Sequence, residues 1–359
     1  MSEKTWLGRR WKLILNMVTL GALAILVYAI RHQLGATFRD LAHINGWALL
    51  LIVPVEALNY HAQAKLYKKL FHLVGNDLPY KFLYQASLEL NFVNHVFPSG
   101  GVTGLSYFSV RMRKGQELTG AKATLVHVTK LGLTFLSFEL LVIFGLFCLA
   151  VMGRVSNLTI LVAAVVSTLL VVGTIGFIYI VGSKQRINNF FTAVTRILNR
   201  LIHVVRPRYP ETINILKARR VFDDFHNNYD EIKNSYPQLK APFWYAFLAN
   251  VTEVLAVYVV YIAFDKFINI GAVIFAYAVA NFAGLVSVLP GGVGIYEALM
   301  TAVLASTGVA AAVSLPVTIM YRVVNTLIQI PPGYYLYQQT LRRGEQPPGA
   351  PGAEVAGGS

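Results

Sequence analysis

Charged side chains are scarce in this sequence of 359 residues. Lys, Arg, Asp and Glu make up 13% of it, against about 25% in an average soluble domain, whereas 55% of the residues are hydrophobic. The hydrophobic residues form blocks close to the roughly 20 residues that a helix needs to cross the apolar core of a bilayer. The composition therefore argues against a soluble enzyme and predicts an all-α polytopic membrane protein.

Cysteine is nearly absent, since Cys148 stands alone in the apolar run LVIFGLFCLA. One cysteine can form neither a disulfide framework nor a cysteine-based metal site, and no spacing of His, Asp or Glu is typical of a metal site. The glycine-rich stretches lack the Lys-Ser/Thr that completes a P-loop. We therefore expect no metal, no cofactor and no catalytic residue that the sequence alone identifies.

The charges that remain are mostly positive, with a formal net charge of +14. Nucleic-acid binding is one interpretation of such an excess, but the basic residues lie between the apolar blocks and form no basic domain. Lys and Arg in short loops mark the cytoplasmic side of membrane proteins and attract anionic headgroups. We expect membrane lipids with anionic headgroups as partners, and no nucleic acid.

Basic residues also orient the first half of the chain. Segment 1–12 is basic and predicts a cytoplasmic N-terminus before an uncleaved span at 13–30. A second span at 47–64 returns to a lysine-rich segment, 65–69. Block 80–114 has basic residues at both ends, so it should enter from the cytoplasm, turn, and go back as a re-entrant hairpin.

The second half is predicted to repeat this pattern upside down. Segment 183–240 holds eleven Lys/Arg against five Asp/Glu and should be cytoplasmic. Block 268–308 has no basic residue, so its hairpin should open to the outside. The prediction is an inverted-topology repeat with six full crossings, two re-entrant helical hairpins and both termini cytoplasmic. The first membrane repeat covers 13–150, the second covers 157–338, and the Pro/Gly-rich tail 344–359 is expected to be disordered.

The two hairpins carry related breaks. VFPSGGVTG (96–104) and VLPGGVG (288–294) share a proline and a Gly-Gly-Val at matching places in the two halves. Such paired interruptions point to a transporter's binding site, because a helix that starts at membrane depth offers free N–H groups to an anion. Close helix packing by small residues is the alternative that stays open. The predicted binding residues in these breaks are Pro98, Gly100, Gly101, Gly104, Pro290, Gly291, Gly292, Gly294 and Glu297.

Ionisable residues inside apolar spans are costly and suggest function. Lys130 lies 29 residues beyond Gly101 and Arg322 lies 30 beyond Gly292, so two cations share a register with the two breaks. We predict that both bind the substrate, together with Asn325 on the face of Arg322; a purely structural ion pair is the other interpretation. Counter-ion or proton sites are predicted at Glu56, Glu89, His95, His127 and Glu253.

These motifs resemble a known family. PSGGVTG, LPGGVGIYE and the basic segment between them are similar to the lysylphosphatidylglycerol synthase transmembrane region, the flippase-like domain of multiple peptide resistance factors, which also occurs as a stand-alone protein. The resemblance covers about residues 10–340. It implies movement across the membrane of a lipid, commonly aminoacylated phosphatidylglycerol, while relatives are associated with polyprenyl-linked glycans. Two departures are the absence of an aminoacyl-transferase domain after residue 340 and Leu105-Ser106-Tyr107 where many relatives carry an acidic residue.

The leading hypothesis is a flippase-like protein of the plasma membrane that binds and translocates an anionic lipid, aminoacylated or glycosylated phospholipid or polyprenyl phosphate. A membrane-embedded lipid-phosphate transferase, for which Glu297 and His95 are the only candidate groups, is an alternative. A non-transporting scaffold for a separate lipid-modifying enzyme is another, and homo-oligomerisation is left open.

The predicted topology can be tested by cysteine labelling. Gly115→Cys should be cytoplasmic and Ile270→Cys external, because they lie at the open ends of hairpins with opposite orientation. Each is placed in a Cys148→Ala background and labelled with a membrane-impermeant maleimide from either side. Labelling of both positions from the same side would rule out the inverted repeat.

Overall fold

The computed structural model describes residues 44–96, 102–116, 118–151, 157–183, 236–286 and 294–342, with isolated residues between 185 and 189. All regular elements in these ranges are helices. The chain is an all-α membrane protein, as predicted. Several predicted features lie outside the described residues: the N-terminus 1–12, the span 13–30, most of 183–240, the tail 344–359 and the centres of both breaks, 97–101 and 287–293.

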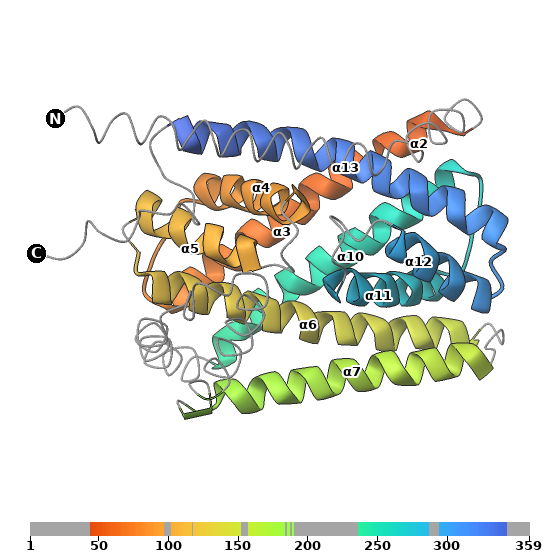
Figure 1. Ribbon diagram of the computed structural model, residues 1–359, viewed down its shortest axis with the longest axis horizontal. Coiled ribbons are helices and arrows are strands. Elements are labelled where there is room, and N and C mark those ends of the chain that lie inside the picture. Colours follow the sequence, from red (N-terminus) through yellow and green to blue (C-terminus); the bar gives the residue numbers. More distant parts are fainter. Residues whose placement is uncertain are drawn as a thin grey trace, which may run out of the picture.

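In chain order the helices are α2 (Gly46–Leu50), α3 (Ile52–Leu73), α4 (Tyr80–Val96), α5 (Val102–Gln116), α6 (Gly120–Val151), α7 (Asn157–Val181), the 3-10 helix η2 (Tyr236–Leu239), α10 (Lys240–Ala263), α11 (Ile270–Val286), α12 (Ile295–Ser306) and α13 (Ala311–Arg342). The second span, predicted at 47–64, is divided in the structure into two helices, a short one and a longer one. The longer helix continues past the lysines to Leu73. The long helices α6, α7 and α13 lie nearly horizontal in Figure 1, and α3 and α10 cross between them on a diagonal.

Helices α3 and α10 pack against each other at the centre and run in opposite directions (Figure 1). Helices α4 and α5 form a pair at one end of the molecule, and α11 and α12 form a pair at the other. Helix α6 contacts both ends, α13 joins α12 to α4 on the other side, and α7 packs outside α6. The two helix pairs, one from each half, thus lie at opposite ends of the molecule, with α3 and α10 between them.

Among the residues that the structure describes, three helical stretches are long and apolar enough to cross a membrane, namely Lys122–Val151, Pro237–Ala263 and Ala311–Arg342. The paired helices are shorter: α4 and α11 have 17 residues, α5 has 15 and α12 has 12. At about 1.5 Å per residue these reach about 18–26 Å, less than the ~30 Å apolar core of a bilayer. Their lengths suit hairpins that turn inside the membrane, and the count of six crossings stays a prediction.

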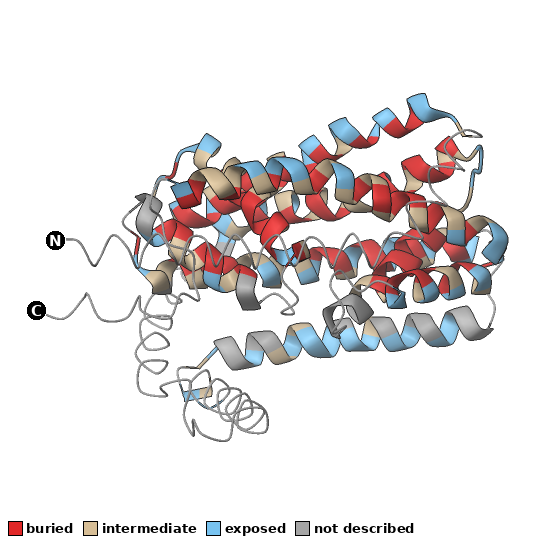
Figure 2. Ribbon diagram, turned by 45° about the horizontal axis from the view of Figure 1, so that its top comes forward, coloured by how far each residue is buried: buried red, intermediate tan, exposed pale blue. Residues whose placement is uncertain are grey.

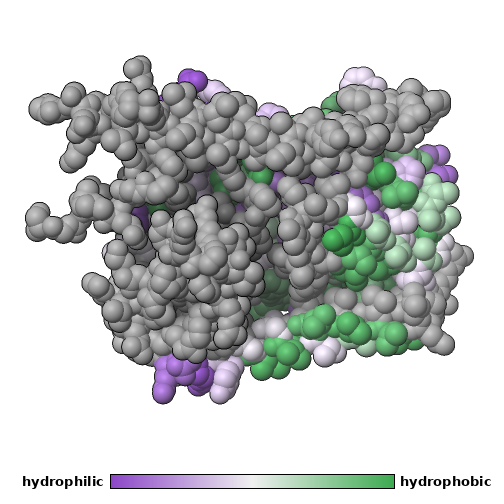
Figure 3. All heavy atoms as spheres, viewed as in Figure 1, coloured by the Kyte–Doolittle hydropathy of each residue, from purple (hydrophilic) through white to green (hydrophobic). Residues whose placement is uncertain are grey.

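The buried apolar side chains of the described residues form two large clusters and a smaller one that joins α4 and α5 to α13. One apolar core lies among α3, α4, α5 and α6, and a second lies mainly among α6, α10, α11, α12 and α13. Buried residues face these centres, whereas α7 exposes most of its described side chains (Figure 2). The exposed side chains there are apolar, for example Ile175 and Val172, and the described surface over α7 is largely hydrophobic in Figure 3. Such a surface is suited to lipid.

The start of α11 is held tightly against the end of α6. The side-chain oxygen of Asn269 accepts a hydrogen bond from the N–H of Gly271, and its amide donates to the carbonyl of Cys148. The two backbones meet at glycines, since a Cβ on Gly271 would lie 2.2 Å from the carbonyl oxygen of Gly145. Small residues at such a point let membrane helices approach closely.

This contact predicts opposite effects for the same substitution at two glycines. Gly271→Ala should destabilise the protein by about 1–3 kcal/mol, because the new methyl group meets backbone that cannot move aside cheaply. Gly176→Ala, in α7 with nothing within 4 Å of its Cβ position, should be neutral or stabilising by up to about 1 kcal/mol. Unfolding of both variants in detergent checks this, and equal stability would contradict the close contact.

Candidate functional site

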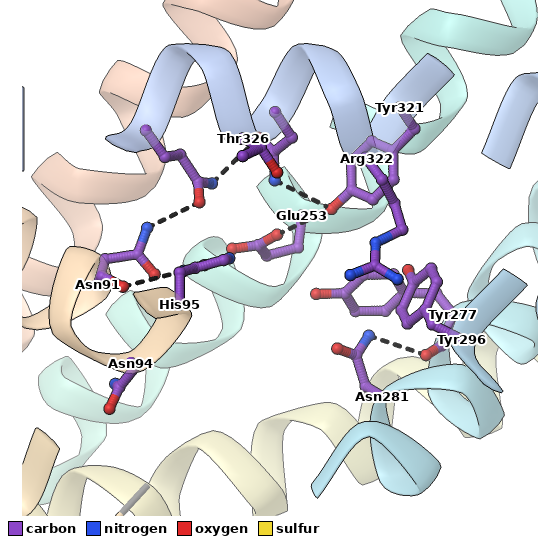
Figure 4. A pocket seen from close by; sticks show the side chains of 12 residues that line it. Asn91, Asn94, His95, Glu253, Tyr277, Asn281, Tyr296, Tyr321, Arg322 and Thr326 are labelled. Atoms are coloured by element: carbon purple, nitrogen blue, oxygen red, sulfur yellow. Dashed lines mark hydrogen bonds between the residues drawn. The ribbon is translucent and has the colours of Figure 1, made fainter. Parts of the chain in front are cut away.

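A polar cavity of about 280 Å³ lies where the two halves meet. Its walls come from both hairpins and from α10 and α13, so segments from both halves of the chain contribute to it (Figure 4). The volume is just below the range of ordinary ligand pockets and suits a headgroup better than a whole lipid. The lining residues are Asn91, Asn94, His95, Glu253, Tyr277, Asn281, Tyr296, Tyr321, Arg322, Asn325, Thr326 and Gln329.

One face of α13 supplies much of the polar wall. Arg322, Asn325 and Gln329 are three and four residues apart, which places them on the same side of a helix. Gln329 donates to Glu56 on α3 at 2.9 Å and accepts from Asn91 on α4 at 2.8 Å. Gln329 also donates to Asn325 at 3.0 Å. This amide therefore joins α13 of the second half to α3 and α4 of the first half.

A second set of hydrogen bonds connects α3, α6 and α10. The amide of Asn59 on α3 donates to Glu253 at 3.3 Å and to the carbonyl of Ala249 at 2.9 Å. Gln63 donates to Asn59 at 2.7 Å, and its oxygen accepts from Lys130 at 3.3 Å. Lys130 thus reaches the cavity residue Glu253 only through two amides. It lies between α6 and α3 instead of lining the cavity.

Arg322 behaves differently from Lys130. Its guanidinium lies among tyrosine rings at the cavity wall, with its carbon 4.9 Å from the ring centre of Tyr296 (Figure 4). It also donates to Glu297 at 2.9 Å. Glu297 follows the second break and is buried behind the cavity wall, at 3% exposure. Of the two predicted cations, Arg322 is the one that lines the cavity.

Two of the predicted ionisable residues lie away from the cavity. Glu89 on α4 pairs with Arg111 on α5 at 2.9 Å and accepts hydrogen bonds from Tyr107 and Thr340. His127 bonds the hydroxyl of Tyr67 at 2.8 Å within the first apolar core. Both have partners that explain their burial, so the structure brings only part of the predicted set together. The predicted members at the cavity are Arg322, Asn325, His95 and Glu253, with Glu56 one hydrogen bond behind.

The described glycines of the two breaks differ. Gly294 has a positive φ of 88° and precedes α12, a conformation that a residue with a side chain adopts only with strain. Gly104 has an ordinary φ, but a Cβ there would collide with Asn94 of α4, so it allows the close packing of α4 and α5. The other predicted residues of the breaks, Pro98, Gly100, Gly101, Pro290, Gly291 and Gly292, lie outside the described residues.

Tyrosines are the lining residues that the sequence did not reveal. Tyr277, Tyr296 and Tyr321 sit in apolar stretches, where an aromatic residue adds to the hydrophobic pattern whichever way it points. In hindsight their neighbours carry a signal, since Tyr277 precedes Asn281 by one helical turn and Tyr321 adjoins Arg322.

A family model described as the lysylphosphatidylglycerol synthase TM region matches residues 13–333. The chain belongs to this family. No curated protein matches the sequence. The match includes every residue that lines the cavity, and the lysylphosphatidylglycerol synthase TM region suggests a role related to membrane lipids, so the site is to be considered in relation to a lipid.

The cavity network predicts a large cost for removing Gln329. Gln329→Leu should destabilise the protein by about 1–3 kcal/mol, because the buried carboxyl group of Glu56 loses its amide partner and leaving a buried polar group without a partner costs roughly that much. Gln339→Leu on the same helix, where the amide bonds an exposed tyrosine, should change stability by less than about 0.5 kcal/mol. Denaturation of both variants in the same detergent compares them, and similar stabilities would show that Glu56 does not depend on this donor.

Proposed function

We propose that the protein is a flippase-like membrane protein that binds an anionic lipid by its headgroup and carries it across the plasma membrane. The observation that supports this most directly is the polar cavity between the two halves, with Arg322 in its wall. An arginine inside an apolar span is costly unless it is paired or faces a polar space, and such residues usually mark a substrate pathway. Membership of the family supports a role with membrane lipids.

The chemistry of the walls suits a phosphate-containing headgroup. A guanidinium matches phosphate geometry through parallel hydrogen bonds, and Arg322 provides one. Glu253 contributes a carboxylate to the same cavity, so a headgroup with both a phosphate and an amine would find partners of both signs. An aminoacylated phospholipid has these two features. The acyl chains stay in the bilayer, because the cavity has room only for a headgroup.

The arrangement of the helices supports translocation rather than binding alone. Short helix pairs at opposite ends, around the antiparallel α3 and α10, suit an inverted repeat with re-entrant hairpins that open to opposite sides. In transporters of this kind the site lies near the membrane midplane and the halves move around it. We include the six crossings and the cytoplasmic termini in the proposal.

Translocation is tested in vesicles that contain a fluorescent phosphatidylglycerol, by quenching the outer leaflet over time. Arg322→Met should slow translocation about fivefold or more, which corresponds to the loss of a charge-assisted contact of about 1 kcal/mol. Arg322→Lys should retain part of the rate because it keeps the charge. Lys130→Met should have a smaller effect, since Lys130 acts through Gln63 and Asn59.

Lys240→Met, an exposed cation at the start of α10, is the matched control and should behave as wild type. The folding of each variant is checked by gel filtration in detergent. Wild-type vesicles without translocation would refute the proposal. New lipid products upon addition of soluble donors would favour the transferase instead.

A further inference from the structure

Both carboxylate oxygens of Glu297 are engaged directly behind the cavity wall. One accepts a hydrogen bond from the guanidinium of Arg322 at 2.9 Å, and the other accepts from the backbone N–H of Gly294 at 2.7 Å. Gly294 is the N-cap residue of α12, directly before the first helical residue. A single side chain thus binds a cation on α13 and the first N–H of its own helix.

These two donors are of the kind that bind phosphate in proteins. A guanidinium and the N–H groups at a helix N-terminus both favour anions, by charge and by geometry. The predicted role of the second break was to offer such N–H groups to a lipid. In the structure both donors bond to a carboxylate of the chain itself. The N–H of Gly294 and the guanidinium of Arg322 each donate to Glu297.

We propose that Glu297 is an exchangeable internal counter-ion of Arg322, which the headgroup phosphate replaces when the lipid binds. The inference rests on the proposed function and deepens it. In the absence of lipid the carboxylate lowers the cost of a guanidinium inside the membrane. When a phosphate enters the cavity, it competes for the same guanidinium, so Glu297 sets the affinity of the site.

The exchange has a structural consequence, because the same carboxylate caps α12. A Glu at the third position of a helix that bonds back to the first N–H fixes the helix start. If the carboxylate leaves Arg322, the first turn of α12 loses its ion pair to α13 and is left with packing contacts there, which loosens the start of the helix. Lipid binding would thereby be linked to the position of the α11–α12 hairpin.

The other buried ion pair of the hairpins provides a contrast. Glu89 and Arg111 are enclosed by Tyr107 and Thr340, and neither lines the cavity. A phosphate in the cavity has no contact with that arginine. The proposal therefore concerns Glu297 alone and does not extend to buried ion pairs in general.

Whether a neutralising substitution of Glu297 tightens or weakens lipid binding tests the proposal. Glu297→Gln keeps an oxygen that can accept from Gly294 but removes the competing charge. Equilibrium binding of a short-chain phosphatidylglycerol to the protein in phosphatidylcholine nanodiscs should become about tenfold tighter. Glu139→Gln, which removes a carboxylate from α6 outside the cavity, should bind as wild type. In the double variant Glu297→Gln/Arg322→Gln the gain should vanish, because the two residues act on the same contact.

Unchanged or weaker binding by Glu297→Gln, with wild-type binding intact, would overturn the inference and leave the proposed function standing. Absence of binding by both proteins would overturn both. A measurement on the wild type covers the case in which the variant fails to fold. Saturating phosphatidylglycerol should speed amide hydrogen exchange in the first turn of α12, and slower or unchanged exchange would overturn the inference.

Discussion

Polar side chains at membrane depth must find their partners inside the protein, because the apolar core of a bilayer offers no water to satisfy them. In this chain the side-chain amides of Asn and Gln supply many of these partners. Gln329 bonds to α3 and α4, and Asn59 on α3 bonds to α10, so together they connect α3, α4, α10 and α13. This network and the apolar contacts that surround it together set the relative placement of these helices, and therefore the shape of the cavity.

The two hairpins have diverged in chemistry while keeping their place in the fold. Three residues beyond the last glycine of each break stand Tyr107 in the first half and Glu297 in the second. Tyr107 donates to Glu89, so α4 supplies the carboxylate that α5 lacks, and the charge is enclosed between α4, α5 and α13. In the second half the carboxylate is on α12 and meets the arginine of the cavity. The first hairpin is thus fixed by its ion pair, and the second is connected through its ion pair to the site.

The sequence allowed prediction of the helical class, the family and the two hairpins' helices, because hydrophobic length and glycine-proline breaks are local signals. It also placed Arg322 and Asn325 on one face, because helical spacing is local too. It predicted equal roles for Lys130 and Arg322, but which cation faces a cavity depends on how each helix is rotated, and spacing along the chain does not carry that information. The tyrosines were missed for the same reason. The pairing of Glu297 with Arg322 joins two helices, so it required the packing to be known.

The contact between Gly271 and Gly145 determines how α11 could move. The backbones of α11 and α6 touch there, and Asn269 adds a hydrogen bond to the carbonyl of Cys148. A helix held at one end by its backbone can tilt about that point but cannot slide along its neighbour. Since α11 is about 25 Å long at 1.5 Å per residue, a tilt of about 10° would move its far end by about 4 Å. The end of α11 at Gly271 would act as a pivot and the opposite end, at Val286, as the moving arm.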